Sequence, residues 1–217
     1  MIEGTVLRGT RVIMGDEAAR FTAAIKTLRD CVAAADYQEI ILPSVWGQET
    51  FEKKAAGSPV LEQMWRFKDK GERDICLIPE VTGVIQELYR EQWEKSLPKP
   101  IRLFYVQRCY RYERPQLGRY REFTQFGVEM LGKPDNDEVK GLLKKCLDAF
   151  ALNYRFIPSV KRGLTYYIED GFEVECDVLG AQKQVAGGGA YAEGTGWAIG
   201  VERLLLALQQ GNQTGDK

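Results

Sequence analysis

The residues best suited to chemistry lie in the segment 110–129, YRYERPQLGRYREFTQFGVE. Arg111 and Glu113 stand two residues apart, so they share one face of a predicted strand. The turn that follows carries three further basic residues: Arg114, Arg119 and Arg121. Guanidinium groups bind phosphate and carboxylate oxygens through a planar fork of hydrogen bonds. The segment therefore predicts a ligand that is anionic at one end and polar or cationic at the other.

The return strand of this hairpin, EFTQFGVEM, separates its side chains by the two-residue period of a strand. One face carries Thr124, Phe126, Val128 and Met130, and the opposite face carries Phe123, Gln125 and Glu129. A strand that only closed a core would not place a glutamine and a glutamate on a face that arginines approach. The alternative interpretation is a solvated amphipathic hairpin, because charged runs are often simply exposed faces.

The absence of histidine limits the chemistry. It removes the imidazole general base, the Ser-His-Asp triad and histidine-ligated zinc. Phosphoryl or nucleotidyl transfer remains, because positioning and charge stabilisation supply most of its catalysis. A carboxylate that attacks an α-phosphate is already ionised at neutral pH.

Composition bounds the class of protein. The chain has 217 residues, 44% of them hydrophobic, and a net charge of −1, which gives no global case for non-specific binding to nucleic acid or membranes. No apolar run approaches the ~18–20 residues that span a bilayer, and the N-terminus has no apolar signal core. Five cysteines, odd in number and far apart, predict neither a disulfide framework nor a zinc site. We expect a cytoplasmic protein with no membrane partner.

The elements that must position these residues form a pattern of the α+β class. Apolar spacing predicts helices at 16–36, 79–93, 135–153 and 196–210. The first is capped by Asp16, and Gly211 ends the last. Strands are predicted at 37–43, which is short and buried, and at 65–68, 74–78, 101–112, 122–130, 164–168, 172–178 and 182–189. We predict a single domain over 1–217, built on a mainly antiparallel sheet of about six strands flanked by helices.

The segment 110–129 closely resembles the second signature motif of class II aminoacyl-tRNA synthetases, in the form carried by histidyl-tRNA synthetases. The resemblance implies that Arg111 binds the α-phosphate of ATP and the amino acid carboxylate, and that Glu113 binds the adenine edge. It also implies that Arg119 reaches the outer phosphates and that Phe123 stacks on adenine. Gln125 and Glu129 would then line the amino acid pocket.

Two further segments resemble motifs of the same family. PEVT at 79–82 is similar to R-P-E-G-T, in which Glu80 and Thr82 would hold the amino group of the amino acid. An alternative is that Glu80 is only a carboxylate favoured at a helix N-terminus. RGLTYY at 162–167 resembles the R-G-L-D-Y-Y signature of histidyl enzymes, which implies that Arg162 acts as a second cation at the reacting phosphate and that Tyr167 contacts the amino acid side chain.

Three more segments resemble motifs of the family, and all the motifs occur along the chain in the order that the family uses. GGGAYA at 187–192 resembles G-G-G-R-Y-D and keeps Tyr191, although a glycine-rich β-bulge is an equal alternative. AIGVER at 198–203 resembles the third motif, with Arg203 at the γ-phosphate side of ATP. The helix, strand and proline at 16–43 resemble the first motif, which implies a homodimer through the region 16–46. Taken alone, this segment is better explained as an ordinary helix packed on a strand.

The resemblance implies a class II catalytic core that uses ATP and Mg²⁺, with Arg111, Arg162 and Arg203 as its catalytic arginines. Between Glu129 and Arg162 there is room for only one helix and a connection, so we expect the family's insertion domain to be absent. Only 14 residues, 204–217, follow Arg203, so we expect no anticodon-binding domain.

Two functions remain open. The first is ATP-dependent amino acid activation, in which an aminoacyl-adenylate forms, with histidine as the favoured amino acid. A tRNA acceptor end, a carrier protein or a small molecule would then take the acyl group. The second is a non-catalytic regulatory paralogue similar to the ATP phosphoribosyltransferase regulatory subunit. The sequence departs from the family motifs at five positions: Ile78, Val81, Thr165, Ala190 and Ala192.

Overall fold

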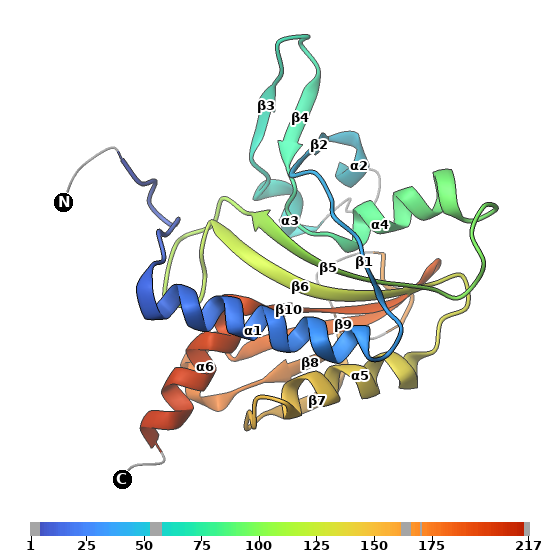
Figure 1. Ribbon diagram of the computed structural model, residues 1–217. Helices are drawn as coiled ribbons and strands as arrows, with labels where there is room; N and C mark the ends of the chain where they lie inside the picture. Colours follow the sequence, from blue (N-terminus) through green and yellow to red (C-terminus); the bar gives the residue numbers. More distant parts are fainter. Residues whose placement is uncertain (1–4, 53–57, 162–165, 170, 215–217) are drawn as a thin grey trace.

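The computed structural model describes residues 5–52, 58–161, 166–169 and 171–214. Its main body is a seven-stranded sheet with the order β1-β5-β6-β10-β9-β8-β7 (Figure 1). The strands are β1 (Gln38–Glu39), β5 (Ile101–Tyr110), β6 (Glu122–Leu131), β7 (Arg155–Val160), β8 (Gly171–Glu175), β9 (Gln184–Tyr191) and β10 (Gly194–Gly200). All neighbouring pairs are antiparallel except β1 and β5, which are parallel. The predicted α+β class is confirmed, with seven strands in place of about six.

One face of the sheet is covered by three helices, α1 (Gly15–Ala33), α5 (Asn136–Asp148) and α6 (Val201–Thr214) (Figure 1). The alternation predicted for β6 supplies the apolar side of this layer, because Phe126, Val128 and Met130 all lie in its core. Asp135 fixes the start of α5, since its carboxylate accepts hydrogen bonds from the backbone N–H groups of Asp137 and Glu138, each at 3.0 Å. The helical layer leaves the opposite face of the sheet for the site.

The opposite face packs against α4 (Thr82–Leu88), which continues into a π-helical turn at Tyr89–Trp93. A second sheet of three strands, in the order β2-β4-β3, projects from this side (Figure 1). Its strands are β2 (Val45–Gly47), β3 (Arg66–Lys68) and β4 (Asp74–Leu77), and two short helices, α2 (Glu49–Glu52) and α3 (Pro59–Glu62), flank it. A 3-10 segment, η2 (Asp177–Gln182), precedes β9. The hairpin predicted at 65–78 is thus present as β3 and β4.

Several predicted elements were wrong in their bounds or surroundings. The segment 37–43 contributes only β1, whose two residues are exposed at the edge of the sheet rather than buried. The last helix begins at Val201 and not at 196, because 194–200 is the strand β10. The helix predicted from 79 begins at Thr82. The strand predicted at 164–168 is reduced, among described residues, to a bridge between Tyr167 and Tyr191.

The predicted helix ends also differ. Met14 occupies the N-cap position of α1 and makes no side-chain capping bond, while Asp16 lies in the first turn. Gly211 lies inside α6, which runs on to Thr214. Among the helices in the described part of the chain, none has the length and apolar character needed to cross a bilayer.

Candidate active site

A cleft of about 350 Å³ opens on the face of the large sheet that the three helices leave free. The sequence predicted one face of β6 for the ligand, and Phe123 and Gln125 line this cleft as expected. Gln125 is fixed by the neighbouring strand, since the Cys109 thiol donates a hydrogen bond to its Oε1 at 3.3 Å. Nine predicted site residues line the cleft: Glu80, Thr82, Arg111, Glu113, Arg119, Phe123, Gln125, Tyr167 and Arg203.

Arg111 begins the cationic end of the cleft. Its Nε donates to the Pro79 backbone carbonyl at 2.8 Å, and its guanidinium carbon lies 5.2 Å from the centroid of the Phe123 ring. The bond to Pro79 holds the guanidinium against the aromatic face. The two groups that the family resemblance assigns to the α-phosphate and to adenine are therefore neighbours.

Arg203 lies in the first turn of α6 and bridges two segments of the cleft wall. Its Nε donates to the Gly118 carbonyl at 2.8 Å, and its Nη1 donates to the Gln184 carbonyl at 3.0 Å. Burial lowers the pKa of the Arg203 guanidinium, and the nearby Glu113 carboxylate opposes this effect. Arg203 thus ties the turn between β5 and β6 to the start of β9. Arg111, Arg119 and Arg203 also line a polar extension of about 400 Å³ at this end.

Glu113 and Arg119 form an ion pair within the cleft. The hydrogen bond to Glu113 raises the pKa of the Arg119 guanidinium. The resemblance assigned Glu113 to the adenine edge and Arg119 to the outer phosphates, but here the two side chains contact each other. Binding in the predicted manner therefore requires Arg119 to exchange the Glu113 carboxylate for phosphate oxygens.

Glu129 is completely buried behind the wall of the cleft, where it contacts the cleft residue Thr82. Its Oε2 accepts a hydrogen bond from the Tyr191 hydroxyl at 2.6 Å, and its Oε1 accepts one from the Thr82 hydroxyl at 2.7 Å. Burial raises the pKa of Glu129 to about 8, and the two hydroxyl donors oppose that rise. A Cβ at Gly196, the partner of Glu129 across the sheet, would lie 2.0 Å from Oε2, so only glycine leaves room for this carboxylate.

Glu80 supports the alternative that the sequence left open. Its Oε1 accepts a hydrogen bond from the Gly83 backbone N–H at 2.9 Å, which caps the first turn of α4. Its Oε2 accepts one from the Tyr166 hydroxyl at 3.2 Å. Glu80 is therefore a helix-capping carboxylate, and its contact with an amino group stays a prediction. Tyr166 lines the same cleft as Glu80 and Thr82.

The glycine run at 187–189 pairs regularly with β10, so the predicted alternative of a β-bulge is absent from this part of the described sheet. A Cβ at Gly188 would meet the Gly196 carbonyl oxygen at 2.1 Å, and a Cβ at Gly189 would meet the Tyr167 ring at 2.9 Å. At Gly188 and Gly189 other protein atoms occupy the space that a side chain would need. Gly187 instead lines the cleft. Arg162 and Thr165 lie outside the described residues.

Sequence reasoning missed three tyrosines that line the cleft, Tyr105, Tyr120 and Tyr166. Tyr166 precedes the predicted Tyr167, and the two ring centroids are 4.7 Å apart. Tyr105 lies opposite Gly127 in the pairing of β5 with β6. The two-residue period of β5 was the signal available for Tyr105, because it places this side chain on the cleft face.

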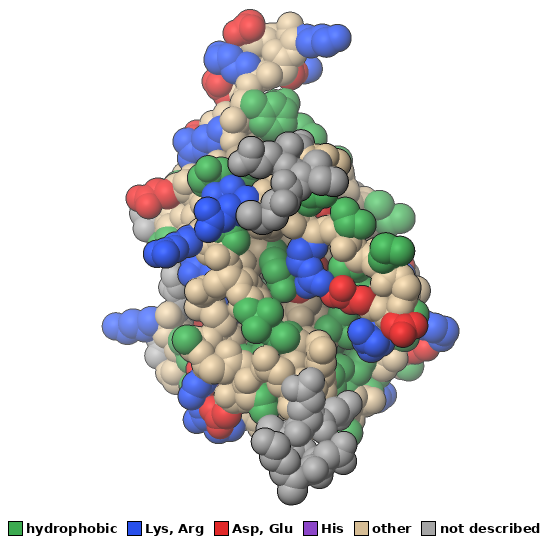
Figure 2. Space-filling model, turned by 90° about the vertical axis from the view of Figure 1, so that its left-hand side faces the viewer, with side chains coloured by type: hydrophobic (Ala, Val, Ile, Leu, Met, Phe, Trp, Pro, Cys, Tyr) green, Lys and Arg blue, Asp and Glu red, His purple; other side chains and the backbone are tan. Residues whose placement is uncertain are grey.

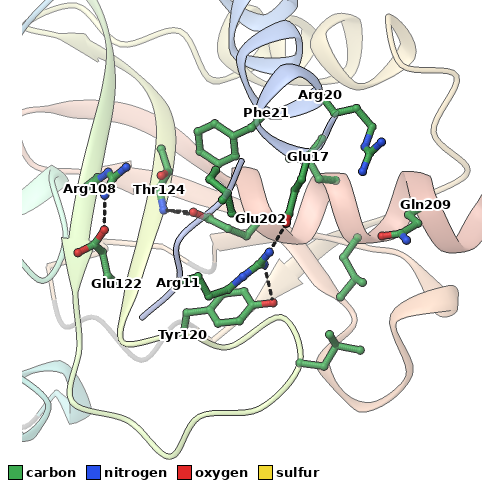
Figure 3. Close-up of a pocket in the computed structure, with 14 residues that line it drawn as sticks. Arg11, Glu17, Arg20, Phe21, Arg108, Tyr120, Glu122, Thr124, Glu202 and Gln209 are labelled. Atoms are coloured by element: carbon green, nitrogen blue, oxygen red, sulfur yellow. Dashed lines mark hydrogen bonds and ion pairs between the residues drawn. The ribbon is translucent and has the colours of Figure 1, made fainter. Parts of the chain in front are cut away.

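A second pocket, of about 320 Å³, lies between the N-terminal segment, α1 and α6 (Figure 3). Arg11 at its centre pairs with Glu17 and donates to the Tyr120 hydroxyl at 3.0 Å. Both oxygens of Glu202 accept from the Thr124 backbone N–H, at 2.8 and 2.9 Å.

Basic, acidic and apolar side chains are mixed over the face of the molecule that Figure 2 shows. The cleft, and not this pocket, gathers the predicted site residues.

The fold is that of a class II aminoacyl-tRNA synthetase catalytic core. The crystal structure of apo S. aureus histidyl-tRNA synthetase matches it with a TM-score of 0.81 and 26% sequence identity, over 96% of this chain and 71% of that one. An ATP phosphoribosyltransferase regulatory subunit/histidyl-tRNA synthetase from Bacillus halodurans shares the fold, with a TM-score of 0.80 and 15% identity, over 96% of this chain and 84% of that one.

The family model for histidyl-tRNA synthetase matches residues 9–154. The histidine–tRNA ligase of Archaeoglobus fulgidus is 39% identical over 150 residues, which are 68% of this chain and 36% of that protein. The ligase of Methanosarcina acetivorans is 28% identical over an alignment of 307 residues, covering 91% of this chain and 74% of that protein. This alignment is longer than the 217-residue chain, so the relative carries additional residues inside the matched span. The chain belongs to the histidyl-tRNA synthetase family.

Proposed function

We propose that this protein activates an amino acid with ATP to form an aminoacyl-adenylate, and that the amino acid is histidine. The observation that carries the proposal is the polarity of one cleft. Arg111, Arg119 and Arg203 gather at one end, where a triphosphate would lie. Glu129 is buried behind Thr82 at the other end, where a side chain with N–H groups would lie.

The reaction joins these two ends. The amino acid carboxylate attacks the α-phosphate of ATP, the new C–O–P bond forms, and pyrophosphate leaves with the electrons of the broken P–O bond. Arg111 is placed to hold the carboxylate and the α-phosphate together, because its guanidinium is anchored at Pro79. Arg119 and Arg203 would neutralise the charge on the departing pyrophosphate. Phe123 offers its ring to adenine, and Arg162 is proposed as the second cation at the reacting phosphate.

Magnesium enters this proposal as part of the ATP substrate. Mg²⁺ usually keeps several water molecules and is bound by phosphates with one or two carboxylates. Within the described residues, no group of three or more potential side-chain ligands converges to form a resident metal site. Glu113 and Glu173 are carboxylates of the cleft. This donor set fits an ion that arrives with the triphosphate.

The partners that we propose follow the same reasoning. Ile41 and Val45 are 89% and 47% exposed, and they flank Pro43 in the region 16–46, which supports a homodimer through that surface. Arg114 and Gln116 belong to the turn that also carries Arg119, and in this proposal they would touch a tRNA acceptor end. A carrier protein or a small molecule would serve equally as the acceptor. We propose a cytoplasmic location, and that residues 1–217 form a single catalytic domain without the family's insertion domain.

A regulatory role is the second candidate. Ile78 occupies the position of the family's arginine and is completely buried in the core, so it offers no charge to a ligand. Ala190 and Ala192 likewise replace an arginine and an aspartate. A protein that binds histidine without turning it over would tolerate these changes.

ATP–pyrophosphate exchange with each of the twenty amino acids separates the two candidates. We expect exchange with histidine, and a loss of at least tenfold in Arg111→Ala, because one charge-assisted contact contributes ~1.5–3 kcal/mol. Lys70→Ala removes an equal charge from the turn between β3 and β4 and should leave the rate unchanged. Absence of exchange with every amino acid would favour the regulatory candidate. Exchange only with an apolar amino acid would contradict the choice of histidine.

A further inference from the structure

The second pocket, between the N-terminal segment, α1 and α6, has a volume of about 320 Å³ (Figure 3). Ligand sites in proteins are typically concave spaces of ~300–1,000 Å³ with apolar walls and a few polar groups. The apolar wall here comes from four parts of the chain: Ile13 before α1, Phe21 of α1, Leu117 of the turn between β5 and β6, and Leu205 and Leu206 of α6. This space suits one ring with a short side chain.

The apolar side chains form a fixed floor and an open rim. Phe21 and Leu205 are partly buried and pack against the main core. Leu117, in contrast, is 64% exposed. A Cβ at Gly118 would lie 3.4 Å from a methyl carbon of Leu206, so α6 reaches the turn that carries Leu117. An apolar ligand that entered the pocket would remove Leu117 from water, which favours binding.

The acidic side chains of the pocket are satisfied within the protein. Arg11 pairs with Glu17, and Arg108 pairs with Glu122. Glu202 accepts hydrogen bonds at both carboxylate oxygens from a backbone N–H of β6. None of the three acids therefore calls for a cationic ligand.

Arg20 of α1 is different. Among the residues that the structure describes, this pocket-lining arginine has no ion pair, hydrogen bond or ring contact. Gln209 of α6 lines the pocket as well, and its amide also has no partner within the same residues. Figure 3 shows both side chains on the side of the pocket away from Arg108 and Glu122. A guanidinium and an amide donor beside an apolar wall suit a single carboxylate.

We propose that this pocket binds a small monocarboxylate with an apolar body, and that Arg20 holds the carboxylate. The pocket takes a different ligand from the cleft, because it offers one unpaired arginine, whereas three arginines line the cationic end of the cleft. The two sites are neighbours nevertheless, since Tyr120 and Glu202 line both. A bound acid would lie behind the wall that the cleft shares. This site is independent of the amino acid activation proposed above.

The test titrates hydrocinnamate, a phenyl ring with a short carboxylate chain, into isotope-labelled protein and follows the backbone amide signals by NMR. We expect a Kd of ~1 mM or tighter. The largest shifts should fall on pocket residues such as Phe21, Leu117 and Leu206, with smaller ones at Arg111 of the cleft. Phenylpropylamine has the same apolar body and a positive charge, so it should bind at least fivefold more weakly.

Three variants check the roles of charge and apolar contact. Arg20→Ala should weaken hydrocinnamate binding at least threefold, because the carboxylate loses its charged donor. Leu117→Asp, at an exposed position, should weaken it further, since it places a second carboxylate at the apolar rim. Arg29→Ala is the matched control. It removes an equal charge from the same helix, where Arg29 pairs with Glu39, and should bind hydrocinnamate as the parent does.

Equal affinity for the acid and the amine, or unchanged binding in Arg20→Ala, would overturn the inference. Displacement of hydrocinnamate by ATP, with the largest shifts at Arg111 and Arg119, would overturn it too, because the acid would then occupy the cleft. So would the absence of any binding up to ~10 mM. Hydrocinnamate binding that depends on Arg20, in a protein that shows no pyrophosphate exchange, would support this inference and count against the proposed catalytic function alone.

Discussion

Replacement of Glu129 by glutamine should reveal the energy stored in a buried acid. The pKa of this carboxyl group is raised from 4.5 to about 8, mainly by burial. Each pKa unit corresponds to ~1.4 kcal/mol, so ionising Glu129 in the folded protein costs up to ~5 kcal/mol. The unfolded chain ionises near pH 4.5 without this cost. The contribution of protonated Glu129 to the free energy of unfolding is therefore complete below about pH 4.5. It is lost as the pH rises to about 8.

Glu129→Gln keeps the shape of the side chain and removes its titration. Urea unfolding of parent and variant at pH 5, 7 and 9 measures the difference. We expect similar free energies of unfolding at pH 5, and a parent that becomes ~2–5 kcal/mol less stable relative to the variant by pH 9. Glu202, whose pKa is also raised by burial, titrates in both proteins and cancels. Parallel stability curves for parent and variant across this range would refute the reasoning.

Two further predictions concern packing and assembly. Gly196→Ala should destabilise the fold by ~2–4 kcal/mol in urea unfolding, because its Cβ would lie 2.0 Å from a Glu129 oxygen and 2.4 Å from the Val128 carbonyl oxygen. Gly141→Ala, in α5 with no atom within 4 Å of the added Cβ, should instead stabilise by ~0.5–1 kcal/mol, and equal losses in both variants would contradict this account. Light scattering at micromolar concentration should give the mass of a dimer, and Ile41→Glu at the exposed segment should shift it to a monomer. A parent that is already monomeric would count against the proposed interface.

The parts of the structure that the sequence predicted are those with strong local patterns. The alternation of β6 separated Phe126 and Val128, which lie in the core, from Gln125, which lines the cleft, and Glu129, which contacts the cleft residue Thr82. The helices α1 and α5 followed from apolar residues at three- and four-residue spacing. The positions of the cleft residues followed from the resemblance of several motifs, which carries information about tertiary structure that composition does not contain.

The errors fall where local pattern is weak or ambiguous. Trp197 of β10 precedes Val201 and Leu204 at helical spacing, so the strand was read as the start of the next helix. The strand β7 was not predicted, because it contains Pro158 at the edge of the sheet and shows no clean alternation. The pairing of Glu113 with Arg119 depends on how the turn folds, and sequence spacing does not reveal it.

The position of β10 has a consequence for how the protein folds. This strand is the last in the sequence, yet it lies between β6 and β9 in the sheet. Without β10 the other strands would fall into two groups, β1-β5-β6 and β9-β8-β7, each with an unpaired inner edge. Non-local pairing of this kind slows folding and exposes strand edges to aggregation. A nascent chain therefore gains a continuous sheet, and with it the cleft, only after residue 200 has left the ribosome, and a chain cut before Gly194 would have neither.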